Sequence, residues 1–143
     1  FMDSTGKRRR ARTGVTMALG ALLAAAPARA QDVAAIIAQG ERARAALDGT
    51  AALAAFERGV ALAPGNYAVL WRASREAGEL GEIAPAGAQR DTLYARAIRW
   101  AQAAVEAEPA GADGQAMLAV ALGRSALAMG VRERVRLASD VRE

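Results

Sequence analysis

The chain has 143 residues, enough for one domain, and its hydrophobic content of 53% favours a packed globule over a disordered chain. The formal net charge of +4 suggests nucleic-acid binding, but the positive charge is concentrated at the start of the chain. Residues 1–30 hold six of the 19 basic residues and one of the 15 acidic residues. Residues 31–143 therefore hold 13 basic and 14 acidic residues, a nearly neutral balance. Domains that bind phosphates are distinctly basic, so this balance argues against nucleic acid as the partner.

The first 30 residues have the three parts of a secretory signal peptide. The basic cluster KRRRAR (7–12) precedes an uncharged run at 13–27, and Ala28-Arg29-Ala30 provides small residues for a cleavage site. The uncharged run is shorter than the roughly 20 residues that a membrane-spanning helix needs. We therefore predict cleavage after Ala30, a mature domain at 31–143 without stable membrane insertion, and a periplasmic or secreted location.

Two other targeting signals remain open for this segment. Its arginines permit a twin-arginine export signal, although the apolar residues expected soon after the arginine pair are missing. Its arginine content and near absence of acid also fit a mitochondrial presequence, but such a presequence forms an amphipathic helix, and this run is apolar on every side. The sequence does not decide between general secretion and twin-arginine export.

The rest of the chain has helical periodicity interrupted by turn residues. Apolar residues recur every three or four positions, and Asp, Gly, Asn and Pro separate the periodic segments. Asp32, Asp48 and Asp91 are expected helix N-caps. The pattern predicts an all-α fold with a loop at 81–90 and helices at 32–47, 50–63, 66–80, 92–108, 112–129 and from 131 onward. Because nothing closes the last helix, we expect the repeat to continue beyond Glu143.

Two of these segments are similar to each other, which indicates a helical repeat. AALAAFERGVALAP and YARAIRWAQAAVEAEP are both Ala-rich helices that end in a proline, Pro64 in one and Pro109 in the other. The helix pairs resemble a tetratricopeptide repeat (TPR), whose period is about 34 residues. With Pro64 as the closing proline, Phe56, Ala52 and Gly40 take the family's aromatic, alanine and glycine positions.

The second unit departs from the period. Its closing proline lies 45 residues after Pro64, so it carries about 11 extra residues, which we place in the 81–90 loop. Ala101 stands where the TPR pattern has an aromatic residue, and Trp100 beside it is expected to fill that volume. The TPR resemblance implies an antiparallel helix-pair array, a right-handed solenoid of about two and a half repeats truncated at its C-terminus.

A narrower resemblance lies in NYAVLWRASREAGELGE (66–82) and LGRSALAMGVRERVRLASDVRE (122–143). These stretches resemble the TPR-like proteins of the regulator of microtubule dynamics family, including its exported bacterial members. The implied function is that of an exported scaffold that binds a protein or peptide. The alternative is a cytoskeletal or organelle-associated protein of the microtubule-regulator type. The sequence specifies neither the partner nor the oligomeric state.

The residue types present in the mature domain argue against an enzyme. Residues 31–143 contain no His, no Cys and no Lys. Their absence removes the usual general base, the thiolate nucleophile, the Cys/His zinc ligands and the Schiff-base amine, so we predict no catalysis and no cofactor. Glu76, Glu79 and Glu82 recur every three residues and could form a metal or acid/base site. We interpret them instead as a solvated helix face.

The TPR register also predicts a binding surface. It places the first helix of each unit along a concave groove, with four candidate partner-binding residues: Arg44, Trp71, Arg75 and Arg124. Arginines beside an aromatic ring suit an extended peptide or an acidic tail. The alternative is that the arginines only keep the surface soluble and that Trp71 packs in the core.

Overall fold

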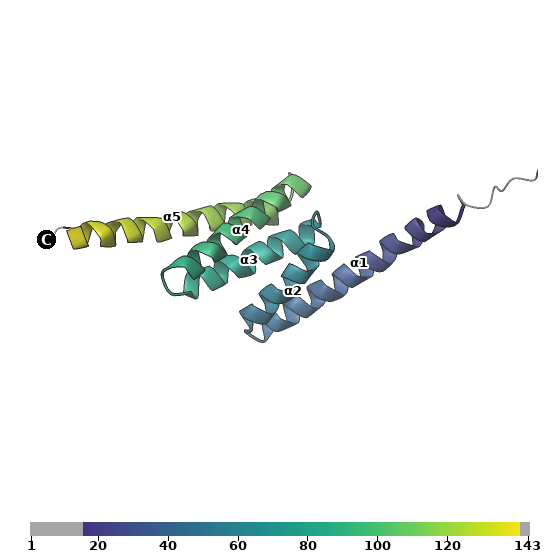
Figure 1. Cartoon of the computed structure of the whole chain (residues 1–143), viewed down its shortest axis with the longest axis horizontal. Helices are drawn as coiled ribbons and strands as arrows, with labels where there is room; N and C mark the ends of the chain where they lie inside the picture. The colour runs from purple at the N-terminus through teal and green to yellow at the C-terminus, as the bar shows by residue number, and fades with distance from the viewer. Residues whose placement is uncertain (1–15, 141–143) are drawn as a thin grey trace, which may run out of the picture. The chain divides into compact units, whose positions relative to one another are not determined.

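The computed structural model describes residues 16–140, with side chains from 29 to 130. The chain divides into two compact units, 1–32 and 33–143, and the fold described below is that of the second. The described part of the chain is all-helical, as predicted, with α1 at Thr16–Ala45, α2 at Gly49–Leu62, α3 at Tyr67–Ile83, α4 at Ala88–Ala107 and α5 at Ala112–Asp140 (Figure 1). The predicted signal peptide lies in the first unit, largely outside the described side chains, so its cleavage after Ala30 remains a prediction.

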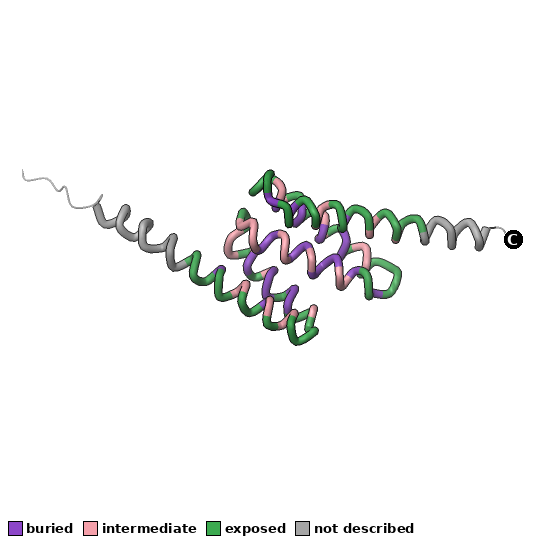
Figure 2. The backbone as a smooth tube through the Cα atoms, turned by 180° about the vertical axis from the view of Figure 1, so that it is seen from behind, coloured by how far each residue is buried: buried purple, intermediate pink, exposed green. Residues whose placement is uncertain are grey.

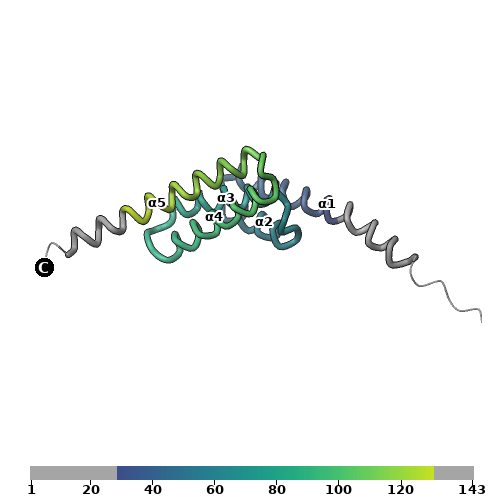
Figure 3. The backbone as a smooth tube through the Cα atoms, turned by 90° about the horizontal axis from the view of Figure 1, so that it is seen from above, coloured from purple at the N-terminus to yellow at the C-terminus, as the bar shows by residue number. Residues whose placement is uncertain are grey.

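The helices of the second unit pack as sequential antiparallel pairs. The end of α1 pairs with α2, α3 pairs with α4, and α5 packs against both α3 and α4 (Figure 1). Buried residues follow α2, α3 and α4 (Figure 2), and α5 lies alongside α4 when the domain is seen from above (Figure 3). Two complete pairs and one further helix give the expected two and a half repeats.

Local side-chain caps fix two of the helix starts. Asp48 accepts a hydrogen bond from the backbone N–H of Ala51 at 2.9 Å, and Asn66 accepts one from Val69 at 3.1 Å. Each bond satisfies one of the N–H groups that the first helical turn leaves without a backbone partner. The predicted breaks before α2 and α3 are therefore confirmed.

The loop predicted at 81–90 is wrong in extent. Helix α3 continues to Ile83 and α4 begins at Ala88, so the extra residues of this unit mainly lengthen the two helices. Gly81 lies inside α3, where a Cβ would come within 2.8 Å of a ring carbon of Tyr94. Asp91 is in the first turn of α4, and the N-cap is Gly87, whose φ of 138° favours glycine. The glycine at 81 therefore permits close helix packing and does not break the helix.

Two other predicted boundaries are also wrong. Helix α1 begins at Thr16 and not at Asp32, because the Ala- and Leu-rich residues before Asp32 continue the helix. Helix α5 runs through Gly130 to Asp140, so the expected turn and separate sixth helix are not found in the described range. A single glycine costs a helix interior only about 1 kcal/mol relative to alanine, which its helix-forming neighbours outweigh.

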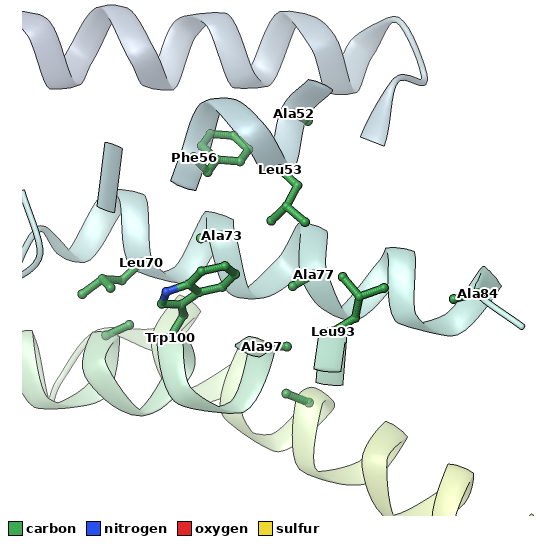
Figure 4. Close-up of a cluster of buried hydrophobic side chains, with 12 residues drawn as sticks. Ala52, Leu53, Phe56, Leu70, Ala73, Ala77, Ala84, Leu93, Ala97 and Trp100 are labelled. Carbon is green, nitrogen blue, oxygen red and sulfur yellow. The ribbon is translucent and has the colours of Figure 1, made fainter. Parts of the chain in front are cut away.

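The core lies where α2, α3 and α4 meet. Phe56 of α2, Leu70 of α3 and Trp100 of α4 point into it, and Figure 4 shows small residues between them. Trp100 is 7% exposed beside the fully buried Ala101, so it fills the volume that the TPR pattern gives to an aromatic residue. Six alanines with no exposed surface let the helices approach closely: Ala52, Ala73, Ala77, Ala97, Ala101 and Ala104.

A buried hydrogen bond adds specificity to this packing, because the Ser74 hydroxyl donates to the carbonyl of Ala97 at 2.8 Å. At the far end of α3, the Tyr67 hydroxyl accepts a hydrogen bond from the N–H of Gly114 at 3.0 Å and ties the start of α5 to α3. None of the helices in the described range has both the length and the apolar composition that crossing a bilayer requires.

Candidate functional site

Charged side chains connect α1 to α3, the first helices of the two complete units. From α1, Arg44 donates to Glu76 at 2.5 Å and to both carboxylate oxygens of Glu79 at 2.6 and 3.0 Å. The two parallel bonds to Glu79 are the bidentate geometry in which a guanidinium binds a carboxylate most strongly. Arg44 therefore joins the end of α1 to two consecutive turns of α3.

A second set of bonds continues this connection toward the start of α3. Glu41 of α1 accepts from Arg72 at 2.7 Å and from Arg75 at 3.2 Å, and Arg75 also donates to Glu76 at 3.0 Å. The six side chains make one continuous set, which we call the Arg–Glu network: Glu41, Arg44, Arg72, Arg75, Glu76 and Glu79. With three guanidiniums and three carboxylates, the network has no formal net charge.

The network shifts the pKa values of two of its members. Partial burial would raise the pKa of Glu41, but hydrogen bonds and charges from Arg72 and Arg75 outweigh it and lower the pKa below its ordinary value. The hydrogen bond to Glu79, together with that to Glu76, raises the pKa of Arg44 above its already high ordinary value. Both residues are held in their charged forms.

Trp71 lies next to the network and contributes to the packing. The guanidinium of Arg72 is 4.1 Å from the centroid of the Trp71 ring, and that of Arg75 is 5.2 Å away. Both distances fall within the range of cation–π contacts. The ring is partly buried and packs against the core cluster, and its role in partner binding stays a prediction.

The structure brings three of the four predicted groove residues together. Arg44, Trp71 and Arg75 lie on the same α1–α3 surface, whereas Arg124 of α5 pairs with Glu82 at the end of α3 at 2.8 Å. Each of the three arginines already has a carboxylate partner within the chain. An acidic tail would therefore have to compete with these internal carboxylates.

The interpretation of Glu76 as part of a solvated face is wrong. Its side chain is 2% exposed, while Glu79 and Glu82, which follow it at intervals of three, are 41% and 59% exposed. Sequence reasoning also missed Arg72 as a member of the site. The position of Glu76 in the helix could have indicated its burial. It directly precedes the fully buried Ala77 and lies one turn after the fully buried Ala73.

A cavity of about 370 Å³ lies beside the network, between the end of α1, the start of α2 and the second half of α3. Two apolar side chains at this cavity are largely exposed, Leu47 at 94% and Ile83 at 79%. Leu47 also has a φ of 60°, a left-handed conformation that non-glycine residues rarely adopt. We call this cavity the α1–α3 pocket, and its lining residues are Arg44, Leu47, Gly49, Glu76, Glu79, Leu80 and Ile83.

The pocket combines apolar walls with charged groups that already neutralise one another. Within the described range, no cluster of three Asp, Glu, His or Cys side chains is arranged to hold a metal ion, so the Glu76, Glu79 and Glu82 series does not form a metal site there. The carboxylates of Glu76 and Glu79 instead hold Arg44. The arrangement is suited to binding an apolar or mixed side chain.

The second unit of the chain matches the model of a known protein family. The model of the regulator of microtubule dynamics protein 1–3 family matches residues 33–143, which is more than three quarters of the chain and the whole of the second unit. Neither the search of curated proteins nor the search of solved structures gave a match. On the extent of the family match and on its TPR-like helix pairs, the chain belongs to the regulator of microtubule dynamics protein 1–3 family.

Proposed function

We propose that the chain is a protein-interaction domain that binds a segment of a partner protein on the surface of α1 and α3. The observation that supports this most strongly is the α1–α3 pocket, which opens on the first-helix side of a TPR-like array and has exposed Leu47 and Ile83 at its mouth. TPR-like proteins stack helix pairs into extended surfaces of this kind, which serve for binding.

The contacts also suggest how such a surface would work. The Arg–Glu network holds α1 and α3 together through side chains of both helices, so the surface is organised before a partner arrives. A preorganised surface loses less conformational entropy on binding. We propose no catalytic role, since residues 31–143 lack the usual nucleophiles and general bases and the pocket carboxylates are engaged by arginine.

We further propose that the domain acts outside the cytoplasm, on the strength of the basic and apolar segments that precede Ala30. The family description, which names microtubule dynamics, supports the alternative of a cytoskeletal protein. N-terminal sequencing of the protein isolated from its native cells distinguishes the two. A start at Gln31 is expected, and a protein that keeps its 7–12 arginine cluster would overturn the export proposal.

Affinity capture from a native extract tests the binding proposal. The wild-type chain is compared with Ile83→Ser, which changes an exposed side chain, and with Trp71→Ala, which changes the surface beside the network. We expect each substitution to reduce the amount of at least one captured protein by about fivefold or more, since interface residues that matter cost over 1 kcal/mol when truncated.

The matched control is Gln102→Ala on the exposed side of α4. It should capture the same proteins as the wild type, and a thermal melt of each variant should show that the fold is retained. Identical capture by the wild type, Ile83→Ser and Trp71→Ala would contradict binding at the α1–α3 surface.

A further inference from the structure

Two of the three arginines in the Arg–Glu network bind a carboxylate and an aromatic ring at the same time. Arg72 and Arg75 both donate to Glu41, and their guanidiniums also lie over the Trp71 ring, 4.1 and 5.2 Å from its centroid. Arginine can make both contacts because its donors lie at the edge of a planar group whose face stacks on aromatic rings. The chain itself therefore shows this mode of binding on the α1–α3 surface.

Arg44, the third arginine of the network, has the carboxylates but not the ring. Its guanidinium donates to Glu76 and Glu79, and within the described residues no aromatic side chain lies over it. The side chain is 33% exposed and lines the α1–α3 pocket. Since the network holds equal numbers of arginines and glutamates, a charged occupant would find no excess of opposite charge there. The pocket therefore favours a neutral occupant that can contact the face of this guanidinium.

The remaining pocket residues suit an apolar ring. Leu47, Leu80 and Ile83 contribute apolar side chains to the lining, and we call them the apolar wall. Leu47 and Ile83 are largely exposed, so an occupant would also remove apolar surface from water. An apolar cavity of roughly 150 Å³ is enough to bind benzene. The α1–α3 pocket, at about 370 Å³, has room for the ring of one aromatic side chain.

Building on the proposed function, we infer that the α1–α3 pocket holds an aromatic side chain of the partner protein. The ring stacks on the guanidinium of Arg44 and packs against the apolar wall. The negative face of an aromatic ring complements the positive charge of a guanidinium, and aromatic residues are common anchors at protein interfaces. Arg44 thereby gains the kind of contact that the other two arginines of the network make with Trp71.

An aromatic ring fits these contacts better than other side chains do. An aliphatic side chain would cover the apolar wall equally well but offers no π-electron face to Arg44. An acidic side chain would have to compete with Glu76 and Glu79, which already bind this guanidinium. A basic side chain would meet carboxylates that Arg44 already neutralises.

Binding of defined peptide pools to the full chain tests the inference. Short fluorescent peptides carry phenylalanine, cyclohexylalanine, pentafluorophenylalanine or glutamate at one fixed central position, with the other positions randomised. Cyclohexylalanine keeps the apolar bulk without the π electrons, and pentafluorophenylalanine reverses the charge distribution of the ring. We expect the phenylalanine pool to bind about fivefold more tightly than either of these two pools, as a cation–π contact at a partly exposed site would give. The glutamate pool should bind least.

Methyl NMR signals of the apolar wall locate the bound ring, because the ring current of an aromatic group shifts the signals of methyl groups beside it. We expect larger shifts at Leu47, Leu80 and Ile83 with the phenylalanine pool than with the cyclohexylalanine pool. Shifts confined to methyl groups elsewhere in the domain would place the ring outside the pocket and would overturn the inference.

Two variants separate the stacking from the apolar wall. Arg44→Lys keeps a positive charge beside Glu76 but has no planar group, so it should reduce the preference for phenylalanine over cyclohexylalanine several-fold. Leu47→Gly removes part of the wall, and glycine suits the left-handed backbone there. It should weaken both pools alike. The matched controls, Arg58→Lys on α2 and Leu122→Ala on α5, should leave both pools unchanged.

Thermal melts show which variants are folded, and if Arg44→Lys is not, the pools compared on the wild type decide. If no pool binds, both the proposed function and the aromatic pocket are overturned. If the phenylalanine and cyclohexylalanine pools bind equally well, or if folded Arg44→Lys keeps the full preference, the aromatic pocket is overturned and the proposed function stands. Strongest binding of the glutamate pool has the same consequence. Sedimentation that shows a dimer which Leu47→Gly dissociates would place a second copy in the pocket and would also overturn the inference.

Discussion

Glu76 is the most deeply buried charged residue in the described part of the chain, with a side chain that is 2% exposed. Two arginines from different helices offset the cost of removing this carboxylate from water, Arg44 at 2.5 Å and Arg75 at 3.0 Å. Buried ion pairs of this kind contribute little net stability compared with apolar packing, but losing one partner leaves a charge uncompensated. Glu76 therefore fixes how α1 and α3 meet.

Substituting Glu76→Gln should destabilise the domain by about 2 kcal/mol. The amide keeps the volume of the side chain but removes the negative charge that Arg44 and Arg75 share. Arg44 is 33% exposed and can reach water, which keeps the loss below that of a fully buried pair. Urea unfolding followed by circular dichroism measures the change, with Glu108→Gln as an exposed control expected within about 0.5 kcal/mol of the wild type. Equal stability of the two variants would show that the buried pairs are not formed.

The positions of the site residues were more predictable than their partners. The TPR register assigned Arg44, Trp71, Arg75 and Arg124 to first helices, and the structure brings the first three together between α1 and α3. Their role in partner binding stays a prediction. The register could not show that Arg44 binds Glu76, since the two residues are 32 positions apart and meet only through the distance between α1 and α3. The α1–α3 pocket could not be predicted for the same reason, because its lining residues come from segments that are distant in the sequence.

At the scale of the helices, the breaks before α2 and α3 were predicted from local sequence and are found. The predicted N-cap Asp48 depends on its side chain and the backbone N–H three residues later, and it is found. The predicted N-caps Asp32 and Asp91 are wrong, because both residues lie inside longer helices. The glycines were harder to interpret. The local sequence around Gly81 favours a helix break, but this glycine lies where Tyr94 packs on α3, and local sequence does not distinguish the two roles.

The glycine at position 40 shows the case in which the repeat pattern supplies that information. The TPR resemblance assigned Gly40 and Phe56 to the family's glycine and aromatic positions. In the structure a Cβ at Gly40 would lie 2.5 Å from a ring carbon of Phe56, so only glycine lets α1 and α2 approach this closely. The repeat pattern indicates which helix packs against Gly40, so it predicts the contact with Phe56, which the local sequence alone does not.

At the scale of the whole molecule, the large aromatic core residues and the charged network of the second unit lie on different helices. The second helices, α2 and α4, supply Phe56 and Trp100 to the core, and the first helices carry the Arg–Glu network and the α1–α3 pocket. The family match covers the same residues, 33–143. We propose that a partner protein binds on this first-helix surface.

Site-specific photocrosslinking in the native cells tests that claim most directly, because it captures a partner whose identity is not yet established. Benzoylphenylalanine is placed at Ile83 beside the α1–α3 pocket and, in separate variants, at the exposed positions Ala54 of α2 and Gln102 of α4. We expect crosslinked protein adducts from position 83 and none from positions 54 and 102. Adducts from position 54 or 102 together with none from position 83 would contradict the proposal.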